Sequence, residues 1–449
     1  MGPQDQLRLD IKIIGAGIAG LACALSLRRK GHSVTVYESN DKLSEFGAGL
    51  QLYSNATRVI YHWGLQDDFL KVVNQPKVNH VRRYSNEVIR EVAHNPVTEW
   101  EYGFPQWVIY RPDLQALLAK AALDAGVVIR FGCAVSDIDA EEGTMSIPGD
   151  GTKLTADLII GADGIRSRSR KTLTDIEARA FSEDAFRALI PKEKMLQDPE
   201  TADLMVGLQS VAWVGPGRAV LGYPVAGGER YNILLCVVRP SEAEVGKWNQ
   251  PGDLDEVRQH LTKWCPLVRK CWSLVDSCAK WTLGDVPPIP SYVSKSGKFV
   301  LVGDAAHAIV PHAGQGAAQA LEDAAALAEF LDPTTLRESR HLAQRMRAFS
   351  SFRQARMENI RRMAFGNARL FTMENGPEQE KRDQIWGAMT AAWKKELAEL
   401  GEEGYRARAK GVVPDQDLKD MRTPAARMYA YGYDVITEAK RVVGSTIVN

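Results

Sequence analysis

The sequence predicts an α/β protein in which a parallel sheet is interrupted by an inserted antiparallel sheet and followed by a helical region. Three observations support this fold class: a strand–helix–strand unit near the start, later strand-like runs that can join its sheet, and helical periodicity from residue 317 onward. The 449 residues allow two or three domains of roughly 150 residues each. A composition of 45% hydrophobic and 25% charged residues is typical of a globular chain with a large core.

The first unit comprises a buried strand at 11–14, a helix at 18–29 and a second strand at 33–37. Three later runs are short, apolar and rich in β-branched or aromatic residues, and each ends near a glycine, as central parallel strands do. These runs lie at 127–131, 157–161 and 299–302. We therefore expect all of these strands to share one parallel sheet.

Between the last two of these runs the pattern becomes that of antiparallel strands. Residues 219–225 and 230–238 flank Gly227-Gly228 and predict a hairpin, which residues 211–214 can extend. This change predicts a second domain inserted into the first.

The remainder of the chain has helical periodicity broken by proline and glycine. Helices are predicted at 317–331, 342–370 and 381–400, and a last helical piece near 435–442. The charged segment 401–416 is predicted to be a linker or a solvated helix.

The chain carries 56 Lys and Arg residues against 56 Asp and Glu residues, so its formal net charge is zero. This balance supplies no basic field for nucleic acid or an anionic membrane, and we expect neither as a partner. No apolar run reaches the roughly 18 residues of a spanning helix. The six cysteines contain no C-x-x-C pair and are interpreted as reduced, buried thiols, so we expect a cytoplasmic protein.

A glycine-rich turn follows the first strand and opens the first helix. Gly15, Gly17 and Gly20 form the pattern G-x-G-x-x-G, with Ala19 inside it. The three glycines allow a tight turn, the approach of a pyrophosphate and close helix packing, and the helix N-terminus offers unpaired N–H groups. Glu38 ends the second strand, where a carboxylate can bind a ribose diol. The turn predicts a dinucleotide site without distinguishing FAD from NAD.

Two further segments carry a resemblance to a known family. G-A-D-G-I-R-S at 161–167 and G-D-A-A-H at 303–307 closely resemble the DG and GD motifs of flavoprotein aromatic hydroxylases. From about residue 11 to 370 the chain resembles the class A FAD-dependent aromatic monooxygenases, particularly salicylate-hydroxylase-like and fungal members. The resemblance implies FAD as the cofactor, NADH or NADPH as co-substrate, and a Rossmann-like FAD-binding domain with an inserted antiparallel-sheet substrate domain.

The resemblance also divides the chain into domains. The FAD-binding domain is expected to be discontinuous, over 1–77, 105–173 and 283–370. The substrate domain is expected over 78–104 and 174–282, and the helical C-terminal region over 371–449. Either a monomer or a homodimer is compatible with this division.

The resemblance assigns further residues to the flavin. Asp304 follows a buried strand, so it can bind a ribityl hydroxyl at the carboxyl edge of the sheet. Arg111 stands where the family carries a flavin-contacting arginine, and Val135 where backbone meets the adenine. Asp163 is expected to help hold the pyrophosphate indirectly and to be linked to NAD(P)H binding. The residues expected along the flavin ring and its loops are Gly49, Pro311, Gly314, Gly316 and Ala317.

Three residues are candidates on the substrate side. Arg187 resembles an arginine that holds a phenolate or carboxylate beside the flavin in fungal members, and its planar fork suits such an anion. Tyr223 lies on a predicted strand that often faces the substrate in this family, with core packing as the alternative. His312 is a candidate proton relay, with helix capping as the alternative. The histidines and cysteines lack metal-ligand spacing, so we expect no metal site.

The resemblance implies reduction of FAD by NADH or NADPH and reaction with O2 to a flavin C4a-hydroperoxide. One oxygen atom then enters an electron-rich aromatic of the phenol or salicylate type. A flavin oxidase or reductase on the same fold, and an indole epoxidase or hydroxylase of alkaloid biosynthesis, remain alternatives. A pure NAD-dependent dehydrogenase leaves the segment at 303–307 unexplained. The expected partners are a small aromatic molecule and O2.

Overall fold

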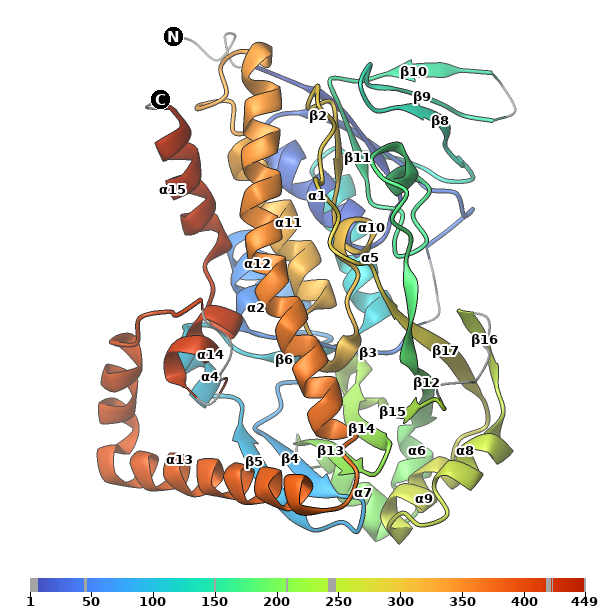
Figure 1. Ribbon diagram of the computed structural model, residues 1–449, viewed down its shortest axis with the longest axis vertical. Coiled ribbons are helices and arrows are strands. Elements are labelled where there is room, and N and C mark those ends of the chain that lie inside the picture. The colour runs from blue at the N-terminus through green and yellow to red at the C-terminus, as the bar shows by residue number, and fades with distance from the viewer. Residues whose placement is uncertain are drawn as a thin grey trace.

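The computed structural model describes residues 7–43, 47–148, 151–206, 209–240, 248–416, 421 and 423–447 (Figure 1). A parallel sheet occupies one half of the molecule and an antiparallel sheet the other, and the chain ends in helices. This arrangement confirms the expected fold class. No helix in the described ranges is long and apolar enough to cross a membrane.

The parallel sheet has the strand order β18-β11-β1-β2-β7. Its members are β1 (Asp10–Ile14), β2 (Ser33–Tyr37), β7 (Val128–Arg130), β11 (Leu158–Gly161) and β18 (Phe299–Leu301). Helix α1 (Ile18–Arg29) joins β1 to β2, as the strand–helix–strand pattern predicts. A small antiparallel sheet lies beside it, formed by β8 (Ser136–Asp139), β9 (Thr144–Ser146) and β10 (Lys153–Thr155) (Figure 1).

Two expectations from the sequence are wrong. The runs at 127–131 and 299–302 predict central strands, but β7 and β18 form the two edges of the sheet, and Val128 is 52% exposed. An apolar run indicates that a segment can join a sheet, but not where in the sheet it lies. The position of β7 depends on the preceding helix α5 (Arg111–Asp124), which brings the chain to that edge. All six cysteines are free, yet Cys133 and Cys278 are only partly buried.

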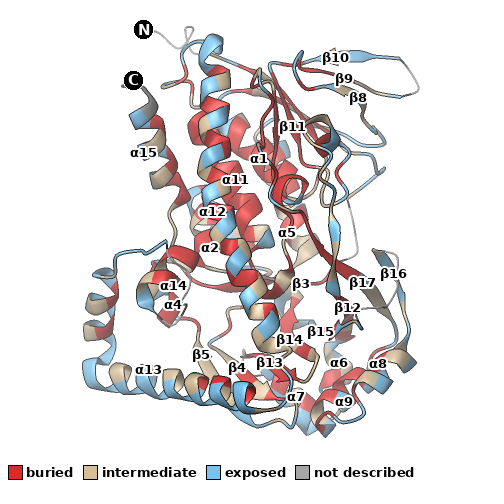
Figure 2. Ribbon diagram, viewed as in Figure 1, coloured by how far each residue is buried: buried red, intermediate tan, exposed pale blue. Residues whose placement is uncertain are grey.

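Helix α11 (Gly316–Phe330) fills the centre of the molecule and is almost wholly buried (Figure 2). Its many alanines are small, so α1, α2 (Ser54–His62) and α15 (Val435–Ile447) pack directly on it. Helix α12 (Leu342–Phe371) runs from the parallel-sheet half to the antiparallel-sheet half (Figure 1). These two helices therefore connect the halves.

The antiparallel sheet has the order β16-β17-β12-β15-β14-β13-β4-β5. The predicted hairpin is confirmed as β14 (Arg218–Val225) and β15 (Arg230–Val238), and β13 (Gln209–Gly215) extends it. Only the β4–β13 pair is parallel among the described neighbours. The remaining strands are β4 (Val78–Arg83), β5 (Val88–Ala93), β12 (Arg179–Pro191), β16 (Asn249–Gly252) and β17 (Cys278–Asp285).

Side chains alternate between the two faces of this sheet. On one face Phe186 and Ile233 are buried with Trp264 under short helices. Those helices are α6 (Lys192–Met195), α7 (Pro199–Val206), α8 (Leu254–His260) and α9 (Pro266–Ser273). The other face presents the neighbouring residues Arg187 and Leu234 toward the parallel-sheet half. The alternation therefore separates a packed outer face from an inner face that is free to bind a ligand.

The C-terminal helices agree in part with expectation. Helix α13 (Pro377–Lys410) packs against β5, bends at Gly401 (φ +64°) and continues to residue 410 with mostly exposed side chains, which confirms the solvated-helix alternative for most of 401–416. Arg406 and Glu402 form an i,i+4 ion pair at 2.7 Å along the helix in this segment, which supports its helical structure. Arg408 and Glu396 pair at 2.8 Å across the bend. Helix α14 (Pro424–Tyr431) has no counterpart in the sequence-based expectation.

Candidate active site

A cavity of about 1670 Å³ lies between the two halves. Its described lining combines residues that follow β1, β11 and β18 with side chains of the antiparallel sheet and of the C-terminal helices. In open α/β sheets, ligands bind at the carboxyl ends of the strands. The cavity thus joins a nucleotide-binding edge to the inner face of the second sheet.

The glycines of the turn after β1 have distinct geometric roles. Gly15 has a φ of +103°, which L side chains rarely adopt. A Cβ at Gly20 would lie 1.9 Å from the Gly15 carbonyl oxygen, so α1 can pack here only on a glycine. A Cβ at Gly17 would meet no atom within 4 Å. The start of α1 is therefore open to a phosphate group.

Glu38 lies directly after β2 and contacts this turn. Its Oε2 accepts a hydrogen bond from the Ala16 N–H at 2.8 Å, and its Oε1 accepts one from the Asn40 N–H at 2.9 Å. These bonds hold the half-exposed carboxylate beside the turn. It can still accept hydrogen bonds from a ribose.

Asp304 and Arg111 face the cavity together. Asp304 begins the short helix α10 (Asp304–His307), and a Cβ on the preceding Gly303 would lie 2.6 Å from the Cβ of Ala19. The Asp304 side chain is open to the cavity but enclosed by the surrounding protein, and this burial raises the pKa of its carboxyl while His307 and Arg111 oppose the rise. Burial lowers the pKa of Arg111. Both groups have hydrogen-bonding capacity left for a ligand.

The loop before α11 also lines the cavity, through Pro311, His312, Gly314, Gly316 and Ala317. Gly314 has a φ of +62°, and a Cβ there would lie 2.7 Å from the ring of Tyr53. A Cβ at Gly316 would meet no atom within 4 Å, so the N-terminus of α11 is open to the cavity.

Of three further residues expected at the flavin, Gly49 lines the cavity, and Asp163 and Val135 are not among its described lining residues. The Gly49 N–H donates to Asn232 Oδ1 at 2.8 Å, and a Cβ there would lie 2.5 Å from the Tyr223 ring. Asp163 accepts hydrogen bonds from Ser167 and from backbone N–H groups of its own turn, so its carboxylate shapes that turn. Val135 is half-buried and lies outside the described cavity lining.

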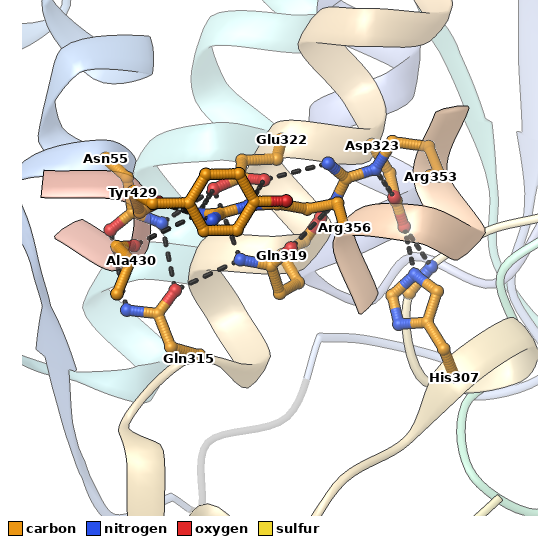
Figure 3. Close-up of polar contacts among 11 residues, drawn as sticks. Asn55, His307, Gln315, Gln319, Glu322, Asp323, Arg353, Arg356, Tyr429 and Ala430 are labelled. Atoms are coloured by element: carbon orange, nitrogen blue, oxygen red, sulfur yellow. Dashed lines mark hydrogen bonds and ion pairs between the residues drawn. The ribbon is translucent and has the colours of Figure 1, made fainter. Parts of the chain in front are cut away.

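A buried charge network supports these loops (Figure 3). Glu322 and Asp323 of α11 pair with Arg353 of α12 at 2.8 and 2.7 Å, and Glu322 also pairs with Arg356 at 2.9 Å. Burial opposes ionisation, but the charges of Arg356 and Arg353 lower the pKa of Glu322 to about 2. Those of His307 and Arg353 lower the pKa of Asp323 to about 2 against the same opposition.

The network reaches the cavity at two points. Asp323 accepts hydrogen bonds from the Gly303 N–H and from His307, both at 2.7 Å, and so holds the turn that carries Asp304. Glu322 accepts a hydrogen bond from Asn55 at 2.7 Å, and Asn55 also donates to Gln315 at 2.9 Å. This network is missing from the expectations based on sequence. The adjacent acids of α11 and the two arginines of α12, three residues apart, are the signals that could have indicated it.

Arg187 and Tyr223 line the same region of the cavity. The Arg187 guanidinium lies over the ring of Trp281 at 5.0 Å, and its buried Nε has no hydrogen-bond partner among the described residues. Burial lowers the pKa of Arg187 and raises that of Tyr223. An uncompensated buried cation favours an anionic ligand.

His312 belongs to a buried cluster that the sequence did not reveal. Its Nε2 lies 2.8 Å from Glu183 Oε2, and Cys236 completes a set whose donor atoms lie within 4.8 Å of one another. Burial and the charge of Glu183 raise the pKa of the Cys236 thiol. These three side chains could together hold a metal ion. Their spacing in the sequence does not indicate such a site, because they come from β12, β15 and the loop before α11, which meet only in the fold.

Comparison with known proteins identifies the class to which this chain belongs. The FAD binding domain family matches residues 8–360. The chain belongs to the FAD-dependent aromatic monooxygenases and is an FAD-binding enzyme of that family.

The FAD-dependent monooxygenase OpS4 of Beauveria bassiana is 31% identical over 98% of both chains. A 3-amino-4-hydroxybenzoate 2-monooxygenase of Streptomyces cremeus is 32% identical over 84% of this chain and 91% of its own. A salicylate hydroxylase substrate complex has the same fold, with a TM-score of 0.73 and 24% identity over 97% of this chain and 98% of that one.

The glycine-rich turn offers a matched pair of variants. Gly17→Ala should fold normally but bind FAD about tenfold more weakly, because its methyl group enters the open space at the start of α1. Gly20→Ala should lower the unfolding free energy by about 1–3 kcal/mol, because its methyl group overlaps the Gly15 carbonyl. Flavin titration and melting of the flavin-free protein measure the two effects. Equal effects of both variants on both readouts would contradict these roles.

The charge network predicts an acid-dependent stability. The folded-state pKa of Glu322 is about 2 against an ordinary 4.5, so its contribution is complete above pH 4.5 and is lost as the pH falls toward 2. Glu322→Gln should cost about 3–5 kcal/mol at neutral pH, because it leaves a buried arginine underpaired. Thermal melting at several pH values measures this loss. The exposed Glu358→Gln is the control, and a similar small effect of both would refute the role of the network.

Proposed function

We propose that this chain inserts one oxygen atom from O2 into an electron-rich aromatic substrate of the phenol or salicylate type, with NADH or NADPH as reductant. The observation that carries this proposal is that Asp304, Gly316 and Arg187 line one cavity. A Cβ at Gly316 would meet no atom within 4 Å, and the Arg187 Nε has no hydrogen-bond partner among the described residues. The relatives include a 3-amino-4-hydroxybenzoate 2-monooxygenase and a 6-hydroxynicotinate 3-monooxygenase, which supports an aromatic substrate.

The residues present fit FAD. The start of α1 at Gly17 would hold the pyrophosphate, Glu38 the ribose, Asp304 the ribityl chain, and the open backbone at Gly316 the ring. Arg111 would contact the flavin beside Asp304. When bound, FAD supplies the chemistry of accepting electrons from NAD(P)H and activating O2.

Arg187 would hold and orient the substrate. Trp281 packs against the guanidinium and limits its motion, so the donor fork is directed in advance toward an anion. Binding a phenolate in this way keeps the ring electron-rich at the carbon that accepts oxygen. Tyr223, packed on Gly49, would form one wall of the ring site and offer its hydroxyl to the substrate.

His312 would move the substrate proton. Glu183 holds one ring nitrogen of His312 at 2.8 Å, which fixes the ring orientation at the cavity wall. The other ring nitrogen can then exchange a proton with a phenol. Glu183 is a positioning residue in this scheme, because it acts through His312.

The reaction is tested by oxygen consumption and NAD(P)H oxidation of the FAD-loaded protein with phenols, salicylates and indoles. Phenols or salicylates should stimulate both rates and yield a product heavier by one oxygen atom. Stimulation by indoles alone would contradict the substrate class. Peroxide formation without an oxygenated product from any panel member would contradict the monooxygenase reaction.

Arg187→Gln should raise the substrate KM about tenfold or divert NAD(P)H oxidation into peroxide, because the substrate anion loses its buried partner. Arg179→Gln on the same strand is the control, since its exposed side chain pairs with Asp285. Initial rates and peroxide yields measure both variants. Wild-type values of both readouts for Arg187→Gln would remove this residue from the substrate site.

A further inference from the structure

A row of directly paired residues crosses the inner face of the antiparallel sheet. The pairs connect β5 to β12 through every strand between them, and all members line the cavity. In order the row is Arg90, Val81, Ala212, Leu221, Leu234 and Arg187. An apolar strip is therefore bounded by an arginine at each end.

The two arginines are far apart. Five strand spacings of about 4.8 Å separate β12 from β5, so Arg90 and Arg187 lie about 24 Å apart across the sheet. A single aromatic ring beside Arg187 cannot also contact Arg90. The cavity therefore continues well beyond the space that a one-ring substrate needs.

Arg90 has no acidic partner in the described chain. Its neighbour Glu91 pairs instead with Lys394 at 2.7 Å. The Arg90 guanidinium lies 5.6 Å from the ring centre of Trp386, and burial lowers its pKa. A guanidinium stays protonated in proteins, so its enclosure without a counter-ion is costly. An anionic ligand would remove that cost.

The C-terminal helices form a roof over this end of the row. Trp386 of α13 packs with Val81 and Ala212, and Phe371 of α12 belongs to the same cluster. Tyr53 lies against Gly314 of the loop before α11, and its ring stacks on that of Tyr431 with ring centres 4.5 Å apart. Both tyrosines lie within electrostatic range of Arg90. Aromatic rings therefore surround the Arg90 end, and the Arg427 cation also acts on Arg90 there. An anion at this end would face two cations.

We propose that Arg90 is an anion-binding subsite and that the substrate is an elongated aromatic acid. Its reacting ring lies by Arg187 and the loop before α11. An apolar spacer lies between the strip and the side chains of α12 and α13 that line the cavity, and a terminal carboxylate pairs with Arg90. This inference rests on the proposed function, since it assigns the substrate class of the same cavity.

The test uses FAD-loaded protein and 4-hydroxyphenyl alkanoic acids of increasing chain length, each with its methyl ester. Affinity is measured without turnover, from tryptophan fluorescence and the flavin absorbance. The acids should bind more tightly as the chain approaches the span to Arg90. At the best length the acid should bind at least tenfold more tightly than its ester, because the ester cannot form the ion pair.

Arg90→Gln should abolish the preference for the acid over the ester, and Arg90→Lys should retain part of it. Arg258→Gln, whose exposed side chain pairs with Asp255 outside the cavity lining, is the matched control and should keep the full preference. Melting temperatures verify that each variant folds. Equal binding of acid and ester by the wild-type protein, or an unchanged preference in folded Arg90→Gln, would overturn the subsite.

Oxygenation is assayed separately on the same samples. An Arg90-dependent acid preference without NAD(P)H-driven oxygenation would support the subsite and contradict the proposed reaction. Oxygenation of short phenols with no Arg90-dependent preference would support the reaction and contradict the elongated acid.

Discussion

The site depends on four charges buried between two helices. Glu322 and Asp323 of α11 face Arg353 and Arg356 of α12, and all four side chains are at most 1% exposed. Such charges persist in a core only when each is paired and hydrogen-bonded. The same carboxylates also bind the Gly303 N–H and the Asn55 side chain, so one cluster positions two segments next to the cavity.

The cluster also ties the C-terminal region to the core. Arg356 of α12 donates hydrogen bonds to the carbonyl oxygens of Tyr429 and Ala430, so α14 is attached to α12. Helix α13 then roofs the inner face of the antiparallel sheet through Trp386. The last part of the chain, which lies beyond the 11–370 range of the family resemblance, thus forms a wall of the cavity.

The two sheets bring residues to the cavity in different ways because their strands are arranged differently. Parallel strands direct their carboxyl ends to one edge, so residues far apart in the sequence, such as Gly17 and Asp304, meet at the nucleotide site. Antiparallel strands alternate their side chains, so one face of β12 packs on helices through Phe186 while the other presents Arg187 to the cavity. The cavity is therefore lined by two separate surfaces, the carboxyl edge of the parallel sheet and the inner face of the antiparallel sheet.

The sequence by itself determined the fold class, the first strand–helix–strand unit, the central hairpin and the glycine-rich turn after β1, because each depends on local periodicity and on glycines at fixed spacing. It could not place β7 at an edge, extend α13 or reveal the partners of His312 and Arg187. Those features depend on which distant segments meet: Glu183 and Cys236 join His312 from separate strands. The row from Arg90 to Arg187 likewise exists only through strand register. Tertiary structure decided these contacts because burial and pairing act between neighbours in space.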